Sequence, residues 1–307
     1  MPESGHALCV RSVGGPLDVQ PEMVVTEALA RLRIGTICCR ESIPAVSVHM
    51  LLSPDTPEER LHRWMERIIT FCAEQGVAFA GADASVGDAV TRDLLTVQAF
   101  YSGAGAAPDK GMLMPGSALY MAGYTGLAGC GIAAHALREN LLQRFSTVLV
   151  ERGLSFMEEG ALPAALPEGA LAVWPVGEGG ILGALWELGE YWNVGLDIDL
   201  RAVPVRQEMI EICDALELHP YQMYTCGAML FTVEAGGGEL PHISDRDGRH
   251  IPAVRIGTVT EGKARIARSG EEIRYVDKPA QDPLMQFVHG VLAEGQGMDG
   301  PQHKRMK

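Results

Sequence analysis

Residues 177–200 constrain the fold more than any other part of this sequence. The run GEGGILGALWELGEYWNVGLDIDL joins a glycine-rich turn, an amphipathic stretch and a short apolar stretch. Ile181, Leu185 and Leu188 recur at a spacing that places them on one face of a helix. The segment GLDIDL that follows is typical of a buried strand. A helix that buries one face beside a buried strand predicts α/β or α+β architecture.

The same alternation extends over most of the chain. Apolar, β-branched runs predict strands at 8–15, 45–52, 77–81, 95–104, 115–123, 195–200, 228–235 and 253–262, and a hairpin at 263–276. Helical periodicity predicts helices at 23–37, 57–74, 126–145, 180–192 and 204–218. We expect a loop and a short helix at 160–175, and a mobile loop at 236–250. The predicted domains are 1–112 and 113–287, followed by a flexible tail at 288–307.

Composition narrows the class of function. The chain has 307 residues, is 47% hydrophobic and carries a formal net charge of −14. This acidity argues against non-specific binding to nucleic acid or to anionic membranes, both of which favour a basic surface. The sequence contains no apolar run long enough to cross a bilayer, and its start lacks the apolar core of a signal peptide. We therefore expect a cytoplasmic protein.

The seven cysteines are irregularly spaced, and no pair has CxxC spacing. In a reducing compartment such cysteines are most simply free, buried thiols. A structural zinc site is not expected.

The segment GADAS at 81–85 is one candidate site. Gly81 would allow close approach of a ligand to the backbone, and Asp83, placed at the end of a predicted strand, could hold Mg²⁺ against a phosphate. The local sequence on its own favours a simpler interpretation, an Asx turn.

Two glycine turns open predicted helices. One spans Gly126–Gly131 and includes Gly129, and the other comprises Gly177, Glu178, Gly179 and Gly180. Exposed N–H groups and the helix dipole favour an anion at such a position. Close packing of a helix against a strand explains the glycines equally well. Glu178 could cap its helix or bind a metal, but its carboxylate would repel a phosphate.

The segment TCGAM at 225–229 places Thr225, Cys226 and Gly227 just before a predicted strand. Cys226 would be a nucleophile if a base lay beside it. We favour a buried structural thiol at this position.

Several of these motifs occur together in one known order. The motifs are GVAFAGADA at 76–84, PGSALYMAGYTGLAG at 115–129, the EGG turn with its helix and VGLDIDL, HPYQMYTCGAML at 219–230, and IPAVRIGTVTEG at 251–262. The sequence resembles the aminoimidazole ribonucleotide (AIR) synthetase superfamily from about Pro44 to Val276. That superfamily includes hydrogenase maturation protein E, thiamine-monophosphate kinase, selenophosphate synthetase and formylglycinamidine synthase, and the resemblance is greatest near the first of these.

The resemblance implies an α/β fold of two domains, an N-terminal sheet domain and a C-terminal αβ sandwich. The N-terminal sheets of two subunits would form a barrel with a groove for ATP and Mg²⁺. Asp83 falls at the family's metal position, and Gly126 and Gly129 match its phosphate-side turn. Thr225, Cys226 and Gly227 match a turn near the substrate.

The sequence departs from the family where the acids should be. The Gly-Asp-Asp-Ala segment has no counterpart, which suggests an N-terminally shortened relative. The Thr-Asp strand reads LCVRSVGG, the Asn-Asp helix reads IGTICCRES, and WPV at 174–176 replaces a His-Asp pair. Several carboxylates are needed to hold the Mg²⁺ ions that bind a triphosphate. Hydrogenase maturation protein E also ends in a cysteine, whereas this chain ends in HKRMK.

Three hypotheses remain open. The leading one is a degenerate member that acts as a binding or scaffold subunit with reduced or lost ATP chemistry, pairing with itself or with an ATP-competent paralogue. The second is an ATP- and Mg²⁺-dependent enzyme with relocated acids, for which the candidates are Asp18, Glu22, Glu41 and Glu178. The third is a protein that binds a small anion other than ATP at the two glycine turns.

Overall fold

The computed structural model describes residues 5–14, 18–35, 44–101, 113–157, 159, 163–165, 167, 169–236, 242–245, 247–279 and 282–284. The predicted tail at 288–307, the candidate acid Glu41 and the boundary region 102–112 lie outside these ranges.

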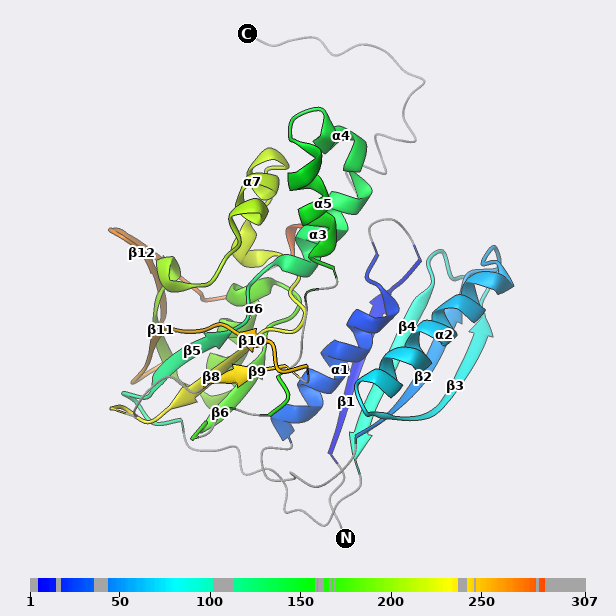
Figure 1. The fold of residues 1–307 in the computed structure, drawn as a ribbon. Helices are drawn as coiled ribbons and strands as arrows, with labels where there is room; N and C mark the ends of the chain where they lie inside the picture. The colour runs from blue at the N-terminus through cyan, green and yellow to red at the C-terminus, as the bar shows by residue number, and fades with distance from the viewer. Residues whose placement is uncertain are drawn as a thin grey trace.

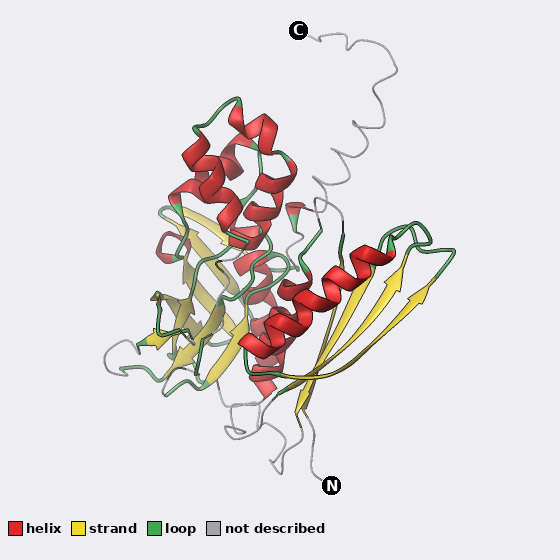
Figure 2. Ribbon diagram, turned by 45° about the vertical axis from the view of Figure 1, so that its right-hand side comes forward, coloured by secondary structure: helices red, strands yellow, loops and turns green. Residues whose placement is uncertain are grey.

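The N-terminal part is a four-stranded sheet with helices on one face (Figures 1 and 2). Its strands are β1 (Gly5–Ser12), β2 (Ala45–Leu52), β3 (Ala78–Val86) and β4 (Leu94–Tyr101), in the order β1-β4-β2-β3. The β2–β3 pair is parallel and the other pairs are antiparallel. Alternate residues of β2 face the core made with α1 (Pro21–Gly35) and α2 (Glu58–Glu74). The opposite face of the sheet carries exposed apolar side chains, including Leu8 and Val10.

The C-terminal part contains a seven-stranded sheet in the order β13-β12-β7-β11-β5-β8-β6. These strands are β5 (Ala118–Ala122), β6 (Ala172–Pro175), β7 (Gly195–Asp199), β8 (Met229–Val233), β11 (Ala253–Thr260), β12 (Arg265–Ser269) and β13 (Glu272–Tyr275). Helix α6 (Gly180–Trp192) buries Ile181, Leu185 and Leu188 against one face. The short pair β9 (Ile243–Ser244) and β10 (His250–Ile251) contributes to the apolar core on the other face.

A helical lobe stands at one end of this sheet, at the top of Figure 1. It comprises α3 (Leu127–Ala136), α4 (Arg138–Leu142), α5 (Thr147–Ser155) and α7 (Gln207–Ala215). The 3₁₀ turns η1 (Leu200–Ala202) and η2 (Pro220–Gln222) link it to the sheet. Helix α1 lies between the two sheets and packs against β1, β4 and β6. Its residue Met23 also enters the core of the helical lobe, so α1 connects the three parts.

The structure agrees with most predicted elements and corrects two that lie in the C-terminal part. The strand at 45–52 and the helix at 180–192 are confirmed to the residue. The predicted helix at 126–145 is wrong as one element, because it is interrupted at Leu137. The expected loop and helix at 160–175 ends instead in β6, which includes Pro175. Proline fits there because β6 is an edge strand, where one side needs no N–H donor.

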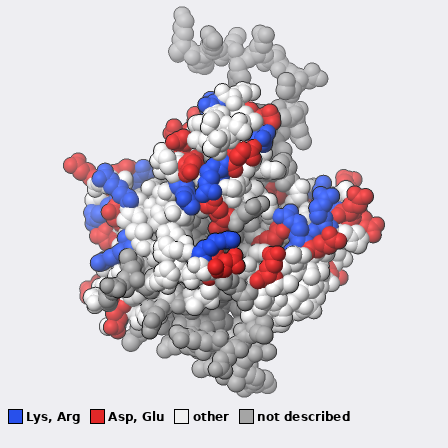
Figure 3. All heavy atoms as spheres, in the orientation of Figure 1, with Lys and Arg blue, Asp and Glu red and all other residues white. Residues whose placement is uncertain are grey.

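Charges of both signs mix on the surface. On the face that Figure 3 shows, Lys and Arg side chains are interspersed with Asp and Glu. Among the described helices, none has both the length and the apolar character needed to cross a membrane.

Candidate functional site

The structure brings the two predicted glycine turns together through Thr225. The backbone N–H of Gly126 donates to the Thr225 hydroxyl at 2.7 Å, and the backbone N–H of Thr225 donates to the Gly177 carbonyl at 3.1 Å. Thr225 itself is 1% exposed and also donates to the Met223 carbonyl. Three separately predicted segments therefore meet around one buried hydroxyl.

Two glycines in these turns are required by backbone geometry. Gly180 has φ +58°, and a Cβ there would lie 2.5 Å from the Tyr221 carbonyl oxygen. Gly126 has φ +75°, and its Cβ would lie 2.8 Å from the Pro220 carbonyl oxygen. Positive φ disfavours other residues, and both contacts are closer than real atoms allow. Both turns therefore pack tightly against 220–223, which is the packing interpretation that the sequence had left open.

A buried carboxylate lies beside the turn that opens α6. Glu27 of α1 has a side chain only 3% exposed. Its carboxylate accepts hydrogen bonds from Arg11 Nη2 at 2.6 Å and from Arg11 Nε at 3.1 Å. Arg31 donates to it at 3.2 Å and the Tyr224 hydroxyl at 3.1 Å. A Cβ built on Gly177 would be 3.5 Å from a Glu27 oxygen. The start of α6, which favours an anion, is thus next to an anion that the chain supplies itself.

The electrostatics around Glu27 are those of a closed polar cluster. Burial and then Glu27 raise the pKa of the Tyr224 hydroxyl well above its usual value, so this group stays a hydrogen-bond donor. The same two causes raise the pKa of Cys9 to about 12. Two arginines and a phenol satisfy the carboxylate, as burial of a charge requires.

Two further acids adjoin this cluster. Glu178, with a side chain 55% exposed, lies 3.4 Å from Arg11. Asp282 is buried, and burial raises its pKa to about 6, although backbone N–H groups of Leu284 and Tyr224 bond to its carboxylate. The carboxylates near the turn at Gly177 are therefore already paired with arginine or with backbone.

Sequence reasoning missed Glu27, Arg11, Tyr224 and Asp282 as members of this site. A signal existed for Glu27, because it follows Met23 and Val24 at helical spacing and so shares their buried face. A charge within an apolar helical stripe indicates a buried ion pair.

Asp83 lies elsewhere. It was expected at a strand end, but β3 continues through it to Val86. Its side chain is 79% exposed and lies 3.1 Å from His49 Nδ1. Both residues lie on the sheet face opposite α1, in a hollow of about 380 Å³ that Gly81, Thr96 and Gln98 also line. The sheet therefore separates Asp83 from the glycine turns of the same chain.

The described residues supply no ready metal cluster. Within the described ranges, no three His, Cys, Asp or Glu side chains gather as possible ligands of one ion. Asp83 has one such neighbour, His49. Its assignment as a metal ligand stays a prediction.

Cys226 is a buried thiol. It is 9% exposed, and its sulfur lies 3.9 Å from the Met23 carbonyl oxygen. Burial and then Glu27 raise its pKa to about 12, so the thiolate needed for nucleophilic attack is disfavoured. Gly227 beside it has φ +81°, typical of a turn residue. These observations agree with the structural interpretation of Cys226.

Trp174 and Pro175, which replace a His-Asp pair in the resemblance, have a packing role. The Trp174 indole N–H donates to Glu187 at 3.1 Å, and its ring packs against Tyr191 and Trp192 at centroid distances of 5.2 and 5.6 Å. Aromatic contacts at these distances stabilise the join between β6 and α6.

The family profile described as "AIR synthase related protein, C-terminal domain" matches residues 114–268, half of the 307-residue chain. Phosphoribosylformylglycinamidine synthase subunit PurL of Leptospira biflexa is 28% identical over 250 residues, covering 74% of this chain and 31% of that protein. PurL of Caldanaerobacter subterraneus subsp. tengcongensis is 27% identical over 176 residues, 54% of this chain and 22% of that protein. The chain thus spans about a third or less of the length of these relatives.

Solved structures show the same fold. The hydrogenase maturation protein HypE of E. coli superposes with a TM-score of 0.66 and 17% identity, covering 92% of this chain and 88% of that one. Thiamine monophosphate kinase of Aquifex aeolicus superposes with a TM-score of 0.59 and 14% identity, covering 87% of this chain and 88% of that one. The α/β, AIR synthetase-like fold expected from the sequence is therefore confirmed.

Proposed function

Because the chain belongs to the AIR synthase related protein family, we propose that it is a binding or scaffold subunit that keeps the family fold with reduced or lost ATP chemistry. One observation carries this proposal. The carboxylate of Glu27, held by Arg11, Arg31 and Tyr224, adjoins the turn at Gly177.

Side chains at the glycine turns do not fit a magnesium triphosphate. A triphosphate needs donors and metal-binding acids around it. At this turn Arg11 donates to Glu27 through Nε and Nη2, and Arg31 donates to it through Nε. Glu178 and Asp282 add negative charge that would repel a phosphate. Bringing in a triphosphate would require either breaking a buried ion pair or accepting like-charge repulsion.

The relocated acids of the alternative hypothesis are dispersed. Asp18 pairs with Arg92 at 2.9 Å, Glu22 pairs with Arg67, and Glu178 lies near Arg11. Three described acids with three different arginine partners do not form one metal-binding cluster. This arrangement favours the leading proposal over an enzyme with relocated acids.

We further propose that two copies pair through the open face of the four-stranded sheet. This face combines exposed Leu8 and Val10 with the hollow that holds His49 and Asp83. An exposed apolar patch rimmed by polar groups is typical of a protein interface. An ATP-competent paralogue could occupy the same face in place of a second copy, and the native mass of the chain, alone and with such a paralogue, distinguishes the two.

The alternative, an ATP-dependent enzyme, has support from two solved structures with this fold. One is HypE in complex with ATP, and another is AaThiL complexed with AMPPCP and TMP. A third possibility, a protein that binds a small anion at the glycine turns, would require an opening of the Glu27 cluster.

Phosphate release from ATP and Mg²⁺ tests the proposal. We expect the purified chain to release no phosphate above background, and Asp83→Ala to give the same result. ATP-dependent release by the natural chain that Asp83→Ala abolishes would overturn the proposal and support the enzyme hypothesis.

A further inference from the structure

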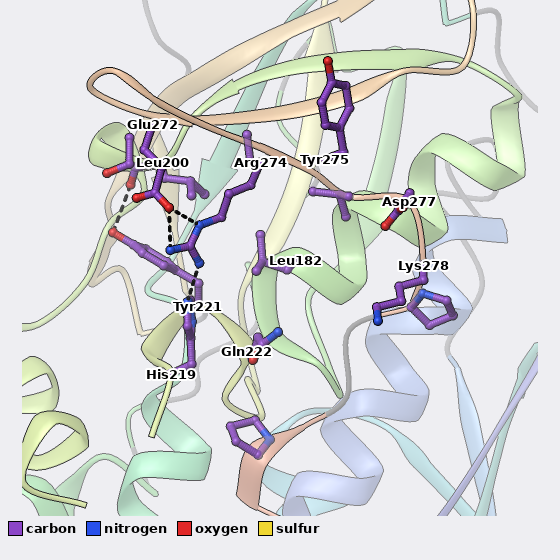
Figure 4. Close-up of a pocket in the computed structure, with 15 residues that line it drawn as sticks. Leu182, Leu200, His219, Tyr221, Gln222, Glu272, Arg274, Tyr275, Asp277 and Lys278 are labelled. Atoms are coloured by element: carbon purple, nitrogen blue, oxygen red, sulfur yellow. Dashed lines mark hydrogen bonds and ion pairs between the residues drawn. The ribbon is translucent and has the colours of Figure 1, made fainter. Parts of the chain in front are cut away.

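A pocket lies beside the last hairpin of the seven-stranded sheet. It encloses about 540 Å³, within the range of small-molecule sites. Three segments form it: the turn around η2, the hairpin β12–β13, and the strap that follows β13 (Figure 4). Its floor is apolar, made by Leu182, Leu200, Ala267 and Val276.

One wall of the pocket carries an anchored cation. Arg274 of β13 bonds to Glu272 at 2.8 Å and lies 3.4 Å from His219 Nε2. Burial and then Arg274 lower the pKa of His219, so this imidazole is neutral at pH 7 and accepts from the guanidinium. Tyr221 is fixed beside them by its hydrogen bond to the Leu200 carbonyl at 3.1 Å. This wall therefore carries one ion pair, between Arg274 and Glu272, beside a neutral imidazole.

Donors without protein partners complete the pocket. Within the described ranges, neither the Gln222 amide nor the Lys278 ammonium makes a side-chain hydrogen bond or ion pair. In Figure 4 these two groups point toward one another from opposite sides of the space near Leu182. An ammonium and an amide that converge over an apolar floor match a ligand with one anionic group and an apolar or planar body.

We propose that this pocket binds a small organic anion, with its carboxylate or phosphate between Lys278 and Gln222 and its body on Leu182 and Tyr221. The acids Glu272 and Asp277 also line the pocket, which limits the charge it can accept. A single anionic group fits this balance better than a di- or triphosphate. The site is separate from the Glu27 cluster and does not depend on the loss of ATP chemistry.

Titration of the full chain with two anionic probes and their neutral counterparts tests this proposal. The probes are adenosine 5′-monophosphate against adenosine, and benzoate against benzamide, followed by ligand-observed NMR and calorimetry. We expect at least one anion to bind and its neutral counterpart to bind more weakly. The anion that binds more tightly shows whether the pocket prefers a phosphate or a carboxylate.

Variants locate the bound anion. Lys278→Gln should weaken binding at least about tenfold, as loss of a charge-assisted hydrogen bond does. Gln222→Ala should weaken it by a smaller factor, and raised salt should weaken binding to the natural chain. Lys263→Gln is the matched control, because this exposed lysine has the same charge and does not line the pocket.

Three results would overturn the proposal. They are no binding of either anion at millimolar concentration, equal binding of anion and neutral counterpart, and equal effects of Lys278→Gln and Lys263→Gln. The side chain of Lys278 is exposed, so its loss should leave folding intact, and unchanged unfolding curves would verify this.

Discussion

Glu27 is the residue on which the proposed function rests. Loss of a buried carboxylate with two arginine partners and a phenol donor lowers the stability of the fold strongly, because its partners are left poorly solvated and unpaired. Its position beside Gly177 connects α1 to the start of α6. The stability of the inter-sheet contact therefore depends on this side chain, and under the proposed function so does the exclusion of a ligand anion.

Glu27→Gln should lower the free energy of unfolding by about 3–5 kcal/mol, since it leaves Arg11 and Arg31 without their charged partner. Urea unfolding of both proteins measures the difference. Glu151→Gln is the control: Glu151 pairs with Arg138 at 2.6 Å but is 51% exposed, so its loss should cost under about 1 kcal/mol. Equal losses in the two variants would contradict the assigned role of Glu27.

Asp282 predicts a pH dependence. Its folded pKa of about 6 exceeds the usual value of 3.8, so the folded protein retains a proton that the unfolded chain has already released between these values. The stability that this proton contributes is present below pH 4 and is lost as pH rises through 6. Asp282→Asn does not titrate, so its stability relative to the natural chain should improve by up to about 3 kcal/mol from pH 4 to pH 7.5.

Urea unfolding of both proteins at the two pH values measures this change. Parallel pH profiles would show that Asp282 does not titrate abnormally.

Contacts between residues far apart in the sequence could not be predicted from local patterns. Thr225, Gly126 and Gly177 could be predicted as site residues because each lies in a glycine turn with a recognisable motif. The bond from Tyr224 to Glu27 spans 197 positions, and no local pattern records it. Asp83 was expected just after a strand, whereas β3 continues through it, and its contact with His49 depends on the pairing of β2 with β3.

At the scale of elements, the turn before α6 combines two separate constraints. Gly180 has both a positive φ and a close contact with η2, whereas Gly262 has φ +78° and nothing within 4 Å of a built Cβ. Gly262 therefore reports the backbone strain alone, and Gly180 reports that strain together with steric overlap. The start of α6 is held in place by both effects.

Gly262→Ala should cost about 1–2 kcal/mol, the strain of a left-handed backbone alone. Gly180→Ala should cost at least about 3 kcal/mol, because its Cβ must also displace the backbone at Tyr221. Thermal or urea unfolding of both variants checks this order. A Gly180→Ala variant no less stable than Gly262→Ala would show that η2 yields easily.

Strong periodicity made several elements predictable. Helix α6 has a clear apolar face, and β2 is rich in apolar and β-branched residues, so both were located to the residue. Strand β6 was missed because its Ala- and Pro-rich sequence is typical of loops, and only its place at the sheet edge permits Pro175. Helix α3 ends early at Leu137, where the helical lobe changes direction, a tertiary effect that the local sequence does not record.

At the scale of the whole molecule, α1 and α2 cover one face of the four-stranded sheet, and no helix among the described residues covers the other. Leu8 is 58% exposed on this face, although Cys9 next to it is 3% exposed. Such alternation, with an apolar residue on the exposed side, favours a partner on that side. The proposed pairing of two copies follows from this asymmetry.

Leu8→Glu should halve the native mass measured by size-exclusion chromatography with light scattering, since it places a charge on the proposed interface. Val148→Glu is the control, because Val148 is 80% exposed on α5, in the helical lobe. Its native mass should equal that of the natural chain. A monomeric natural chain, or an unchanged mass in Leu8→Glu, would contradict self-pairing through this face.

The most direct test of the central claim is isothermal titration of the purified chain with ATP in the presence of Mg²⁺. We expect heats equal to those of dilution, because the turn at Gly177 before α6 adjoins the carboxylate of Glu27, which also forms ion pairs with Arg11 and Arg31. Saturable binding of ATP accompanied by its turnover would contradict the account and make this chain an ATP-dependent enzyme.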